Sequence, residues 1–169
     1  MATGAPARIV VADTNVVINL IHADHLALLG ALPGFAFVVP EDVASEISDP
    51  VQRQALEAAI NAGHLRREMI TSPAELTRYA QLRHVVGKGE AACLALAESR
   101  GWLIASDEKR RFRREVLAGI GGGRLVTTPG LFVLAIRSGA LSIDAADEAK
   151  AILEQHRFRM SFKSFRDVL

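Results

Sequence analysis

Short apolar runs alternate with helical patterns along the chain, and this alternation limits the folds open to it. Two runs, Arg8–Ala12 and Phe35–Val39, are β-branched or aromatic and bounded by turn residues, as buried parallel strands are. Residues 65–70, 102–105 and 124–127 are weaker strand candidates. Helices are predicted at 15–31, 41–48, 51–62, 74–85, 89–100, 108–118, 130–137 and 142–155. The pattern predicts an α/β fold, a three-layer α/β/α sandwich around a central parallel sheet of about five strands.

The size and composition of the chain indicate one domain. It has 169 residues, of which 50% are hydrophobic, which is enough for a substantial core. No repeat, low-complexity stretch or long linker divides it. We therefore expect a single domain over residues 1–169, with 142–169 forming a C-terminal helix and a basic tail packed on it.

The cellular setting expected from the sequence is the cytoplasm. The single cysteine, Cys93, has no internal disulfide partner and lies in an apolar stretch. Residues 1–7 lack the basic and apolar regions of a secretory signal. No apolar run approaches the roughly 18 residues that span a bilayer, so no membrane association is expected.

Four carboxylates occupy positions that suggest chemistry. Asp13 and Asp107 each follow a predicted strand, Glu46 lies in a short amphipathic segment, and Glu90 follows Gly87-Lys88-Gly89. Open parallel sheets bind ligands beyond the carboxyl ends of their strands, so strand-end acids favour a metal site. A strand-end Asp can also simply cap the next helix, and an acid in a first helical turn is favoured by the helix dipole.

Carboxylates are the ligands that Mg²⁺ and Mn²⁺ prefer, and the four acids could hold one ion or two together. Like charges disfavour joint ionisation. We therefore predict that at least one of the four has a raised pKa in the metal-free protein. Asn15, Ser106 and Thr14 cannot replace a carboxylate, but they can hydrogen-bond and orient Asp13 and Asp107.

Cations gather beside Asp107, although the net charge is only +1. Lys109, Arg110, Arg111 and Arg113 follow it directly and could hold a polyanion near the acids, or form a solvated face. Lys88 could likewise touch a phosphate or be solvated. The segment 157–166 interleaves cations with aromatic residues, which suits either a surface that stacks single-stranded bases or an edge strand.

Four fragments of the chain together resemble the PIN-domain nucleases, including the toxins of VapBC-type toxin–antitoxin pairs. They are Val10-Val-Ala-Asp13-Thr14-Asn15, Val39-Pro40-Glu-Asp-Val43-Ala-Ser-Glu46, Gly87-Lys-Gly-Glu90-Ala-Ala-Cys-Leu-Ala-Leu-Ala97 and Leu103-Ile-Ala-Ser106-Asp107. Each fragment alone is weak, but all four occur in the family's order. Asp42 shares a helix face with Glu46, and the family pattern selects Glu46.

The resemblance implies a Mg²⁺- or Mn²⁺-dependent endoribonuclease whose catalytic and metal-binding residues are Asp13, Glu46, Glu90 and Asp107. It also implies RNA as substrate. If the chain is a toxin, an antitoxin protein would cover the crevice. The segment 16–29 is apolar on more than one face, which core burial explains, and a homodimer or antitoxin surface is the alternative.

Two other functions remain open from the sequence. A haloacid-dehalogenase-like phosphatase also begins with a strand-end Asp, but it needs a second Asp where this chain has Asn15. A non-catalytic PIN-fold module that binds RNA or protein is the other, and the presence of all four acids argues against it.

Overall fold

The structure is a computed structural model that describes residues 6–169. The first five residues, which belong to the segment used to predict that no secretory signal is present, lie outside the described residues. Within the described residues, no helix combines the length and the apolar character needed to cross a membrane.

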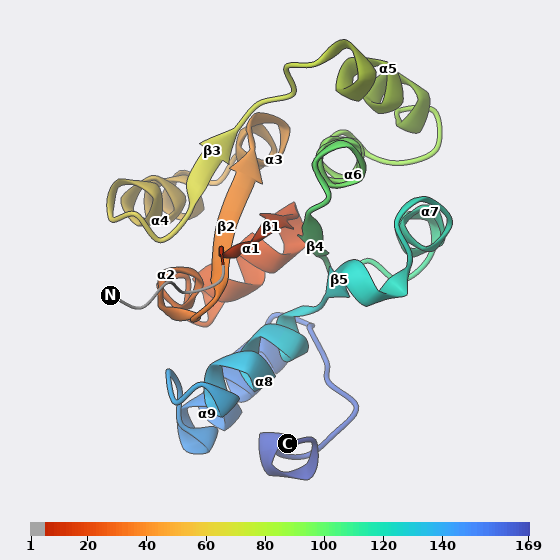
Figure 1. Ribbon diagram of the computed structural model, residues 1–169. Coiled ribbons are helices and arrows are strands. Elements are labelled where there is room, and N and C mark those ends of the chain that lie inside the picture. Colours follow the sequence, from red (N-terminus) through yellow and green to blue (C-terminus); the bar gives the residue numbers. More distant parts are fainter. Residues whose placement is uncertain (1–5) are drawn as a thin grey trace.

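The centre of the fold is a five-stranded sheet in which every pairing is parallel, and the order is β3-β2-β1-β4-β5 (Figure 1). The strands are β1 (Arg8–Ala12), β2 (Phe35–Pro40), β3 (Arg66–Glu68), β4 (Leu103–Ala105) and β5 (Leu125–Val126). The predicted α/β class with about five parallel strands is confirmed. Strands β2 and β3 lie on one side of β1, and β4 and β5 lie on the other, so the strand order changes direction between β1 and β4. Open α/β sheets bind their ligands beyond the strand ends at such a point.

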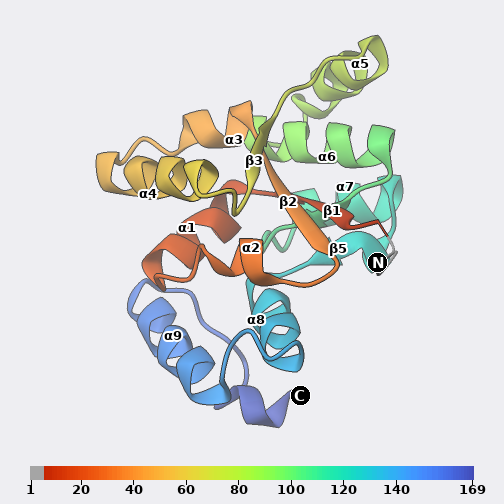
Figure 2. The same cartoon turned by 60° about the vertical axis from the view of Figure 1, so that its left-hand side comes forward.

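Helices flank both faces of this sheet. Within residues 6–169 they are α1 (Thr14–His22), α2 (Leu28–Ala31), α3 (Glu41–Glu46), α4 (Pro50–Asn61), α5 (Pro73–Leu82), α6 (Lys88–Arg100), α7 (Arg111–Gly119), α8 (Thr128–Arg137) and α9 (Ile143–Gln155). Helix α6 packs on β1 and β4 and also contacts α5 and α7, whereas α1 contacts α4, α8 and α9. In Figures 1 and 2, α8, α9 and the C-terminus form one group, and α5 lies at the opposite end of the molecule.

Three local predictions were wrong. The helix expected over 15–31 is two helices, because the chain turns at Asp24, whose φ is 56°, before α2 begins. The basic helix begins at Arg111 rather than at 108, so Lys109 and Arg110 lie in the preceding loop. Residues 157–164 form no strand, which excludes the edge-strand interpretation of the tail.

The core explains why these helices have their patterns. Helix α6 is buried almost all round, from Ala91 to Ala97, since it lies between the sheet and two other helices. The apolar residues of 16–29 are mostly buried, as core packing requires. The C-terminal segment reaches the same core, because Phe165 is fully buried and Phe158, Met160 and Phe162 pack against buried residues.

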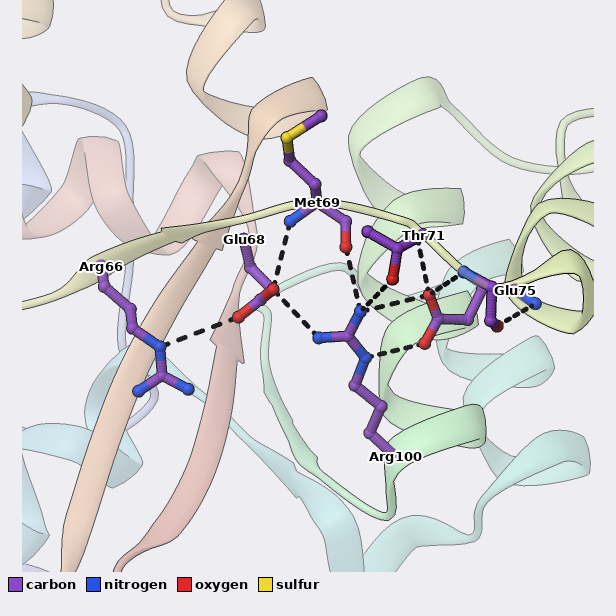
Figure 3. A network of polar contacts seen from close by, with 7 residues as sticks. Arg66, Glu68, Met69, Thr71, Glu75 and Arg100 are labelled. Atoms are coloured by element: carbon purple, nitrogen blue, oxygen red, sulfur yellow. Dashed lines mark hydrogen bonds and ion pairs between the residues drawn. The ribbon is translucent and has the colours of Figure 1, made fainter.

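Arg100, the last residue of α6, ties β3 and the start of α5 to the core (Figure 3). Its guanidinium donates to both carboxylate oxygens of the buried Glu75, at 2.7 and 3.2 Å, and lies 3.0 Å from a carboxylate oxygen of Glu68. Glu75 also accepts hydrogen bonds from the backbone N–H groups of Thr71 and Ser72. These bonds lower the pKa of Glu75 to about 2, chiefly through Arg100.

A pair of stacked histidines joins α1 to the end of α9. The rings of His22 and His156 lie 3.7 Å apart between centroids, and Nδ1 of His22 is buried without a hydrogen-bond partner in the described part of the chain. Burial, and secondarily the charge of His156, lowers the pKa of His22. The unfolded chain therefore binds a proton at His22 more readily than the folded chain does.

We accordingly expect His22 to contribute a loss of stability as the pH falls below about 6.5, the ordinary histidine pKa. In His22→Phe, which keeps a flat ring against His156, this contribution should be absent. Urea unfolding of both proteins between about pH 7 and pH 5 measures it. An equal pH response in the two proteins would show that His22 does not carry this linkage.

Candidate active site

Asp13 lies between the ends of the two central strands. It directly follows β1, and its backbone N–H donates to the carbonyl of Ala105 at the end of β4. Its side chain caps α1 by accepting from the N–H of Thr14 at 2.8 Å, and it accepts from the hydroxyl of Ser106 at 3.0 Å. Only 3% of the residue is exposed. Capping and placement at the sheet's ligand-binding edge therefore occur together.

Glu46, the last residue of α3, joins this edge of the sheet from a second element. Its carboxylate accepts from the hydroxyl of Thr14 at 2.6 Å and from the backbone N–H of Gly89 at 2.8 Å. A Cβ at Gly89 would lie 2.7 Å from a carboxylate oxygen of Glu46, so any other residue there would displace that carboxylate. Asp42 instead lines a separate hollow beside Tyr79. Thus Glu46, and not Asp42, is the acid of α3 that accepts a hydrogen bond from Thr14, the residue directly after Asp13.

Glu90 lies in the first turn of α6, and its carboxylate accepts from the backbone N–H of Gly87 at 3.0 Å. It is therefore a helix cap. It also lies near other carboxylates. Burial raises the pKa of Glu90, and the charges of Glu108 and Glu46 raise this pKa further. A capping role and a position beside other carboxylates coexist here.

The carboxylate of Asp107 is hydrogen-bonded to Thr128 and Asn19 and not to the residues that hold Asp13 and Glu46. One oxygen accepts from the backbone N–H of Thr128 at 2.8 Å, and the other accepts from the Thr128 hydroxyl at 2.5 Å and from the amide of Asn19 at 3.0 Å. Burial raises its pKa, and these hydrogen bonds oppose the rise. In this arrangement Asp107 links the end of β4 to α8 and α1. Its assignment as a metal ligand stays a prediction.

Asn15 and Ser106 organise the loop that follows β4. The side-chain oxygen of Asn15 accepts from the N–H of Asp107 at 3.2 Å, and its amide donates to Glu108 at 3.3 Å. Ser106 donates to Asp13 and accepts from the N–H of Glu108 at 3.2 Å. Glu108 was not among the predicted site residues, although an acid next to Asp107 was a visible signal. Asn19 and Thr128, which hold Asp107, were also missed.

The electrostatics of the site are dominated by burial. The pKa of Asp13 is raised to about 7, first by desolvation and to a smaller extent by the charges of Glu90 and Glu46, against the opposing hydrogen bonds from Thr14 and Ser106. The predicted rise is present, but burial rather than repulsion is its main cause. No Lys or Arg of the described residues forms an ion pair with Asp13, Glu46, Glu90 or Glu108. These acids therefore have no ion-pair partner among the described residues.

This donor set suits a hard divalent cation in charge and in chemistry. In the part of the chain that the structure describes, no three His, Cys, Asp or Glu side chains converge closely enough to hold an ion as they stand. The carboxylates of Glu46 and Glu90 are instead held by hydrogen bonds from Thr14, Gly89 and Gly87. Metal binding would exchange some of these hydrogen bonds for metal contacts.

Basic side chains lie on both sides of the acids. Lys109 and Arg113 line a cavity of about 470 Å³ that Glu108 also borders. Arg110 and Arg111 line a second hollow, of about 450 Å³, together with Glu90 and Glu108. Lys88 donates to the hydroxyl of Ser45 at 3.2 Å. Glu108 thus borders both hollows.

An open parallel sheet with carboxylates gathered beyond its central strands is the architecture of a PIN domain. The model of the family DUF3368, a PIN domain, matches residues 9–169. The chain therefore belongs to the PIN-domain family, whose members are generally nucleases and typically use divalent metal ions. No curated protein sequence matches the chain.

Proposed function

We propose that this PIN domain is a metal-dependent endoribonuclease that hydrolyses RNA phosphodiester bonds. The observation that carries the proposal is that Asp13, Glu46 and Glu90 lie beyond the strand ends, near enough for the charges of Glu46 and Glu90 to raise the pKa of Asp13. None of the three forms an ion pair with a Lys or Arg of residues 6–169. The basic side chains around the group supply the complementary surface for a polyanion.

In this proposal Asp13, Glu46 and Glu90 hold one or two Mg²⁺ or Mn²⁺ ions, and Asp107 joins them if its carboxylate leaves Thr128. The bound cation would supply an acidified water and neutralise charge on the scissile phosphate. The chain's own residues do the remaining work. Thr14 and Ser106 hold the carboxylates of Asp13 and Glu46 in place by hydrogen bonds. The phosphates of the RNA strand are held by the basic side chains Lys109, Arg110, Arg111 and Arg113.

Two acids on α3 provide a matched test of the site. Glu46→Gln should lower Mn²⁺-dependent cleavage of single-stranded RNA at least tenfold, since loss even of a group supporting a metal ligand costs about 10- to 100-fold. Asp42→Asn, one helical turn earlier, should leave the rate within about twofold of wild type, because Asp42 borders a different hollow. Cleavage is followed on a labelled oligonucleotide, with EDTA as the metal-free control. Equal losses in both variants, or equal retention, would contradict the assignment.

We further propose that the enzyme is the toxin of a toxin–antitoxin pair in the cytoplasm, acting as a homodimer and covered by an antitoxin. The motifs shared with VapC-like toxins support this. A neighbouring short reading frame that encodes a DNA-binding protein, together with inhibition of cleavage by that protein, is the expected result. A purified neighbouring product that neither binds nor inhibits the chain would remove the support.

A further inference from the structure

The proposed function uses only charged residues at the edge of the cavity of about 470 Å³, such as Lys109 and Arg113, and gives no role to the rest of its lining. Its walls come from the loop 106–109, from Arg113 of α7, from the junction of β5 with α8, and from the C-terminal segment 158–162. The C-terminal segment reaches this place because the chain turns at Arg157, whose φ is 65°. The distal end of the sequence thus completes a hollow directly beside the acidic site.

The cavity has an apolar lining. Phe158, Met160 and Phe162 of the C-terminal segment contribute to it, together with Leu125 and Pro129 at the junction of β5 with α8. The three tail residues are half-buried and packed against the core, so their positions are fixed by packing. Phe162 lies edge-on to the buried Phe165, with 4.9 Å between ring centroids, whereas no ring partner is found for Phe158 within the described residues. A flat aromatic group could therefore enter against Phe158 without displacing another ring.

The charged groups around the lining favour an anionic occupant. Lys109, Arg113 and Arg159 border the cavity, and none of them pairs with an acid in the described part of the chain. The two bordering acids accept hydrogen bonds, Asp107 from Thr128 and Glu108 from Asn15, and the charge of Lys109 acts on Asp107 to lower its pKa. Three cations and two acids thus border the lining. An apolar slot bordered by more cations than acids matches the chemistry of a nucleotide, whose flat base carries a phosphate at its side.

We propose that this cavity is a nucleobase subsite that takes one unstacked base of single-stranded RNA next to the scissile phosphodiester. The inference rests on the proposed nuclease function and adds a substrate class to it. Glu108 borders both this cavity and the hollow lined by Arg110 and Arg111, so a single strand can cross the acids with a basic groove on either side. A duplex base is stacked and paired, and it cannot enter the slot.

The test is binding rather than turnover. A fluorescently labelled single-stranded oligoribonucleotide is titrated with the protein in EDTA, so that cleavage cannot intervene, and a series of oligonucleotides each lacks one base. We expect one abasic position to weaken binding to wild type about tenfold, the effect typical of losing one base stacked on an aromatic ring. Phe158→Ala should weaken binding of the intact oligonucleotide to a similar extent and should no longer respond to that abasic position.

Matched variants keep the result interpretable. Phe158→Tyr should restore binding, because it restores the flat ring. Met160→Ala tests the same wall if Phe158→Ala does not fold. Arg159→Ala should lower affinity and reduce the salt dependence by about one charge. Arg137→Ala, on the exposed last turn of α8 and away from the lining, should bind like wild type.

Several results would overturn the subsite. They are indifference to base removal at every position, unchanged binding by both Phe158→Ala and Met160→Ala, and equal affinity for single-stranded and duplex RNA. Unchanged binding by both variants, or equal affinity for the two forms of RNA, would indicate that the cavity binds a protein segment and not a base. The two proposals fail separately. Base-sensitive binding without Asp13-dependent cleavage would overturn only the nuclease, whereas Asp13-dependent cleavage with no base sensitivity would overturn only the subsite.

Discussion

Replacing Asp13 by asparagine is expected to remove metal-dependent RNA cleavage and, in the same protein, to stabilise the metal-free fold. The loss of cleavage should be at least about 100-fold, since even a group that only supports a metal ligand contributes about 10- to 100-fold. The gain in stability follows from burial. Asp13 is 3% exposed, and its pKa rises from 3.8 to about 7 on folding.

The sign of the stability effect follows from proton binding. Between pH 3.8 and about 7 the folded chain binds a proton at Asp13 that the unfolded chain releases. The wild-type protein therefore loses stability as the pH rises through this range, by up to about 4 kcal/mol at about pH 8. Asparagine is neutral at every pH and can still accept from Thr14, so the variant should lack this loss. Denaturant unfolding in EDTA at about pH 5 and pH 8 measures the difference.

Asp24→Asn is the matched control, because Asp24 is exposed and its positive φ is one that asparagine tolerates. It should change neither cleavage nor the pH response of stability. If Asp13→Asn were less stable than wild type at about pH 8, the ionised carboxylate would be stabilised in the fold by more than Thr14 and Ser106 provide. Excess Mg²⁺ should narrow the gap between wild type and variant, since only wild type keeps the ligand.

The sheet was largely predictable because its central strands are dense in β-branched and aromatic residues. β1 was placed with its observed bounds and β2 within one residue, since both are buried on the two faces of the sheet. β5 has only two residues, and such a short strand carries little pattern of its own. The break between α1 and α2 was missed because apolar residues continue past the end of α1 to Leu26, Leu28 and Leu29, so the sequence pattern does not mark that end.

The positions of the acids could be read from the sequence, whereas the directions of their side chains could not. Asp13 directly follows β1, and Asp107 follows β4 after Ser106, yet one carboxylate faces Ser106 and the other faces Thr128. Asp107 is directed by a residue 21 positions later, and Glu46 by Gly89, 43 positions away. Such contacts depend on how the helices pack. No local pattern contains that information.

Breaking the pair of Glu75 and Arg100 is expected to have the largest effect on stability outside the acidic site (Figure 3). The pKa of Glu75 falls from 4.5 to about 2 on folding, mainly because Arg100 binds the ionised form. A depressed carboxylate pKa stabilises the fold above pH 4.5, and this contribution disappears as the pH falls through about 2. Glu75→Gln should therefore lose about 3 kcal/mol at neutral pH and progressively less in acid.

Glu57→Gln is the matched control, because Glu57 pairs with Arg67 while 41% of its side chain is exposed. Exposed pairs contribute little, so its loss should stay below about 1 kcal/mol. Urea unfolding at about pH 7 and pH 3 compares the variants with wild type. Equal losses in Glu75→Gln and Glu57→Gln at neutral pH would show that burial of the Arg100 pair adds nothing.

The same variant separates stability from chemistry. Arg100 ends α6, whereas Glu90 lies in its first turn, about 15 Å away along the helix axis at 1.5 Å per residue. Folded Glu75→Gln should therefore cleave RNA at close to the wild-type rate, measured well below its unfolding midpoint. A large loss of cleavage in protein that is still folded would mean that the position of Glu90 depends on how the far end of α6 is held. The acids would then depend for their placement on α5 as well as on the sheet.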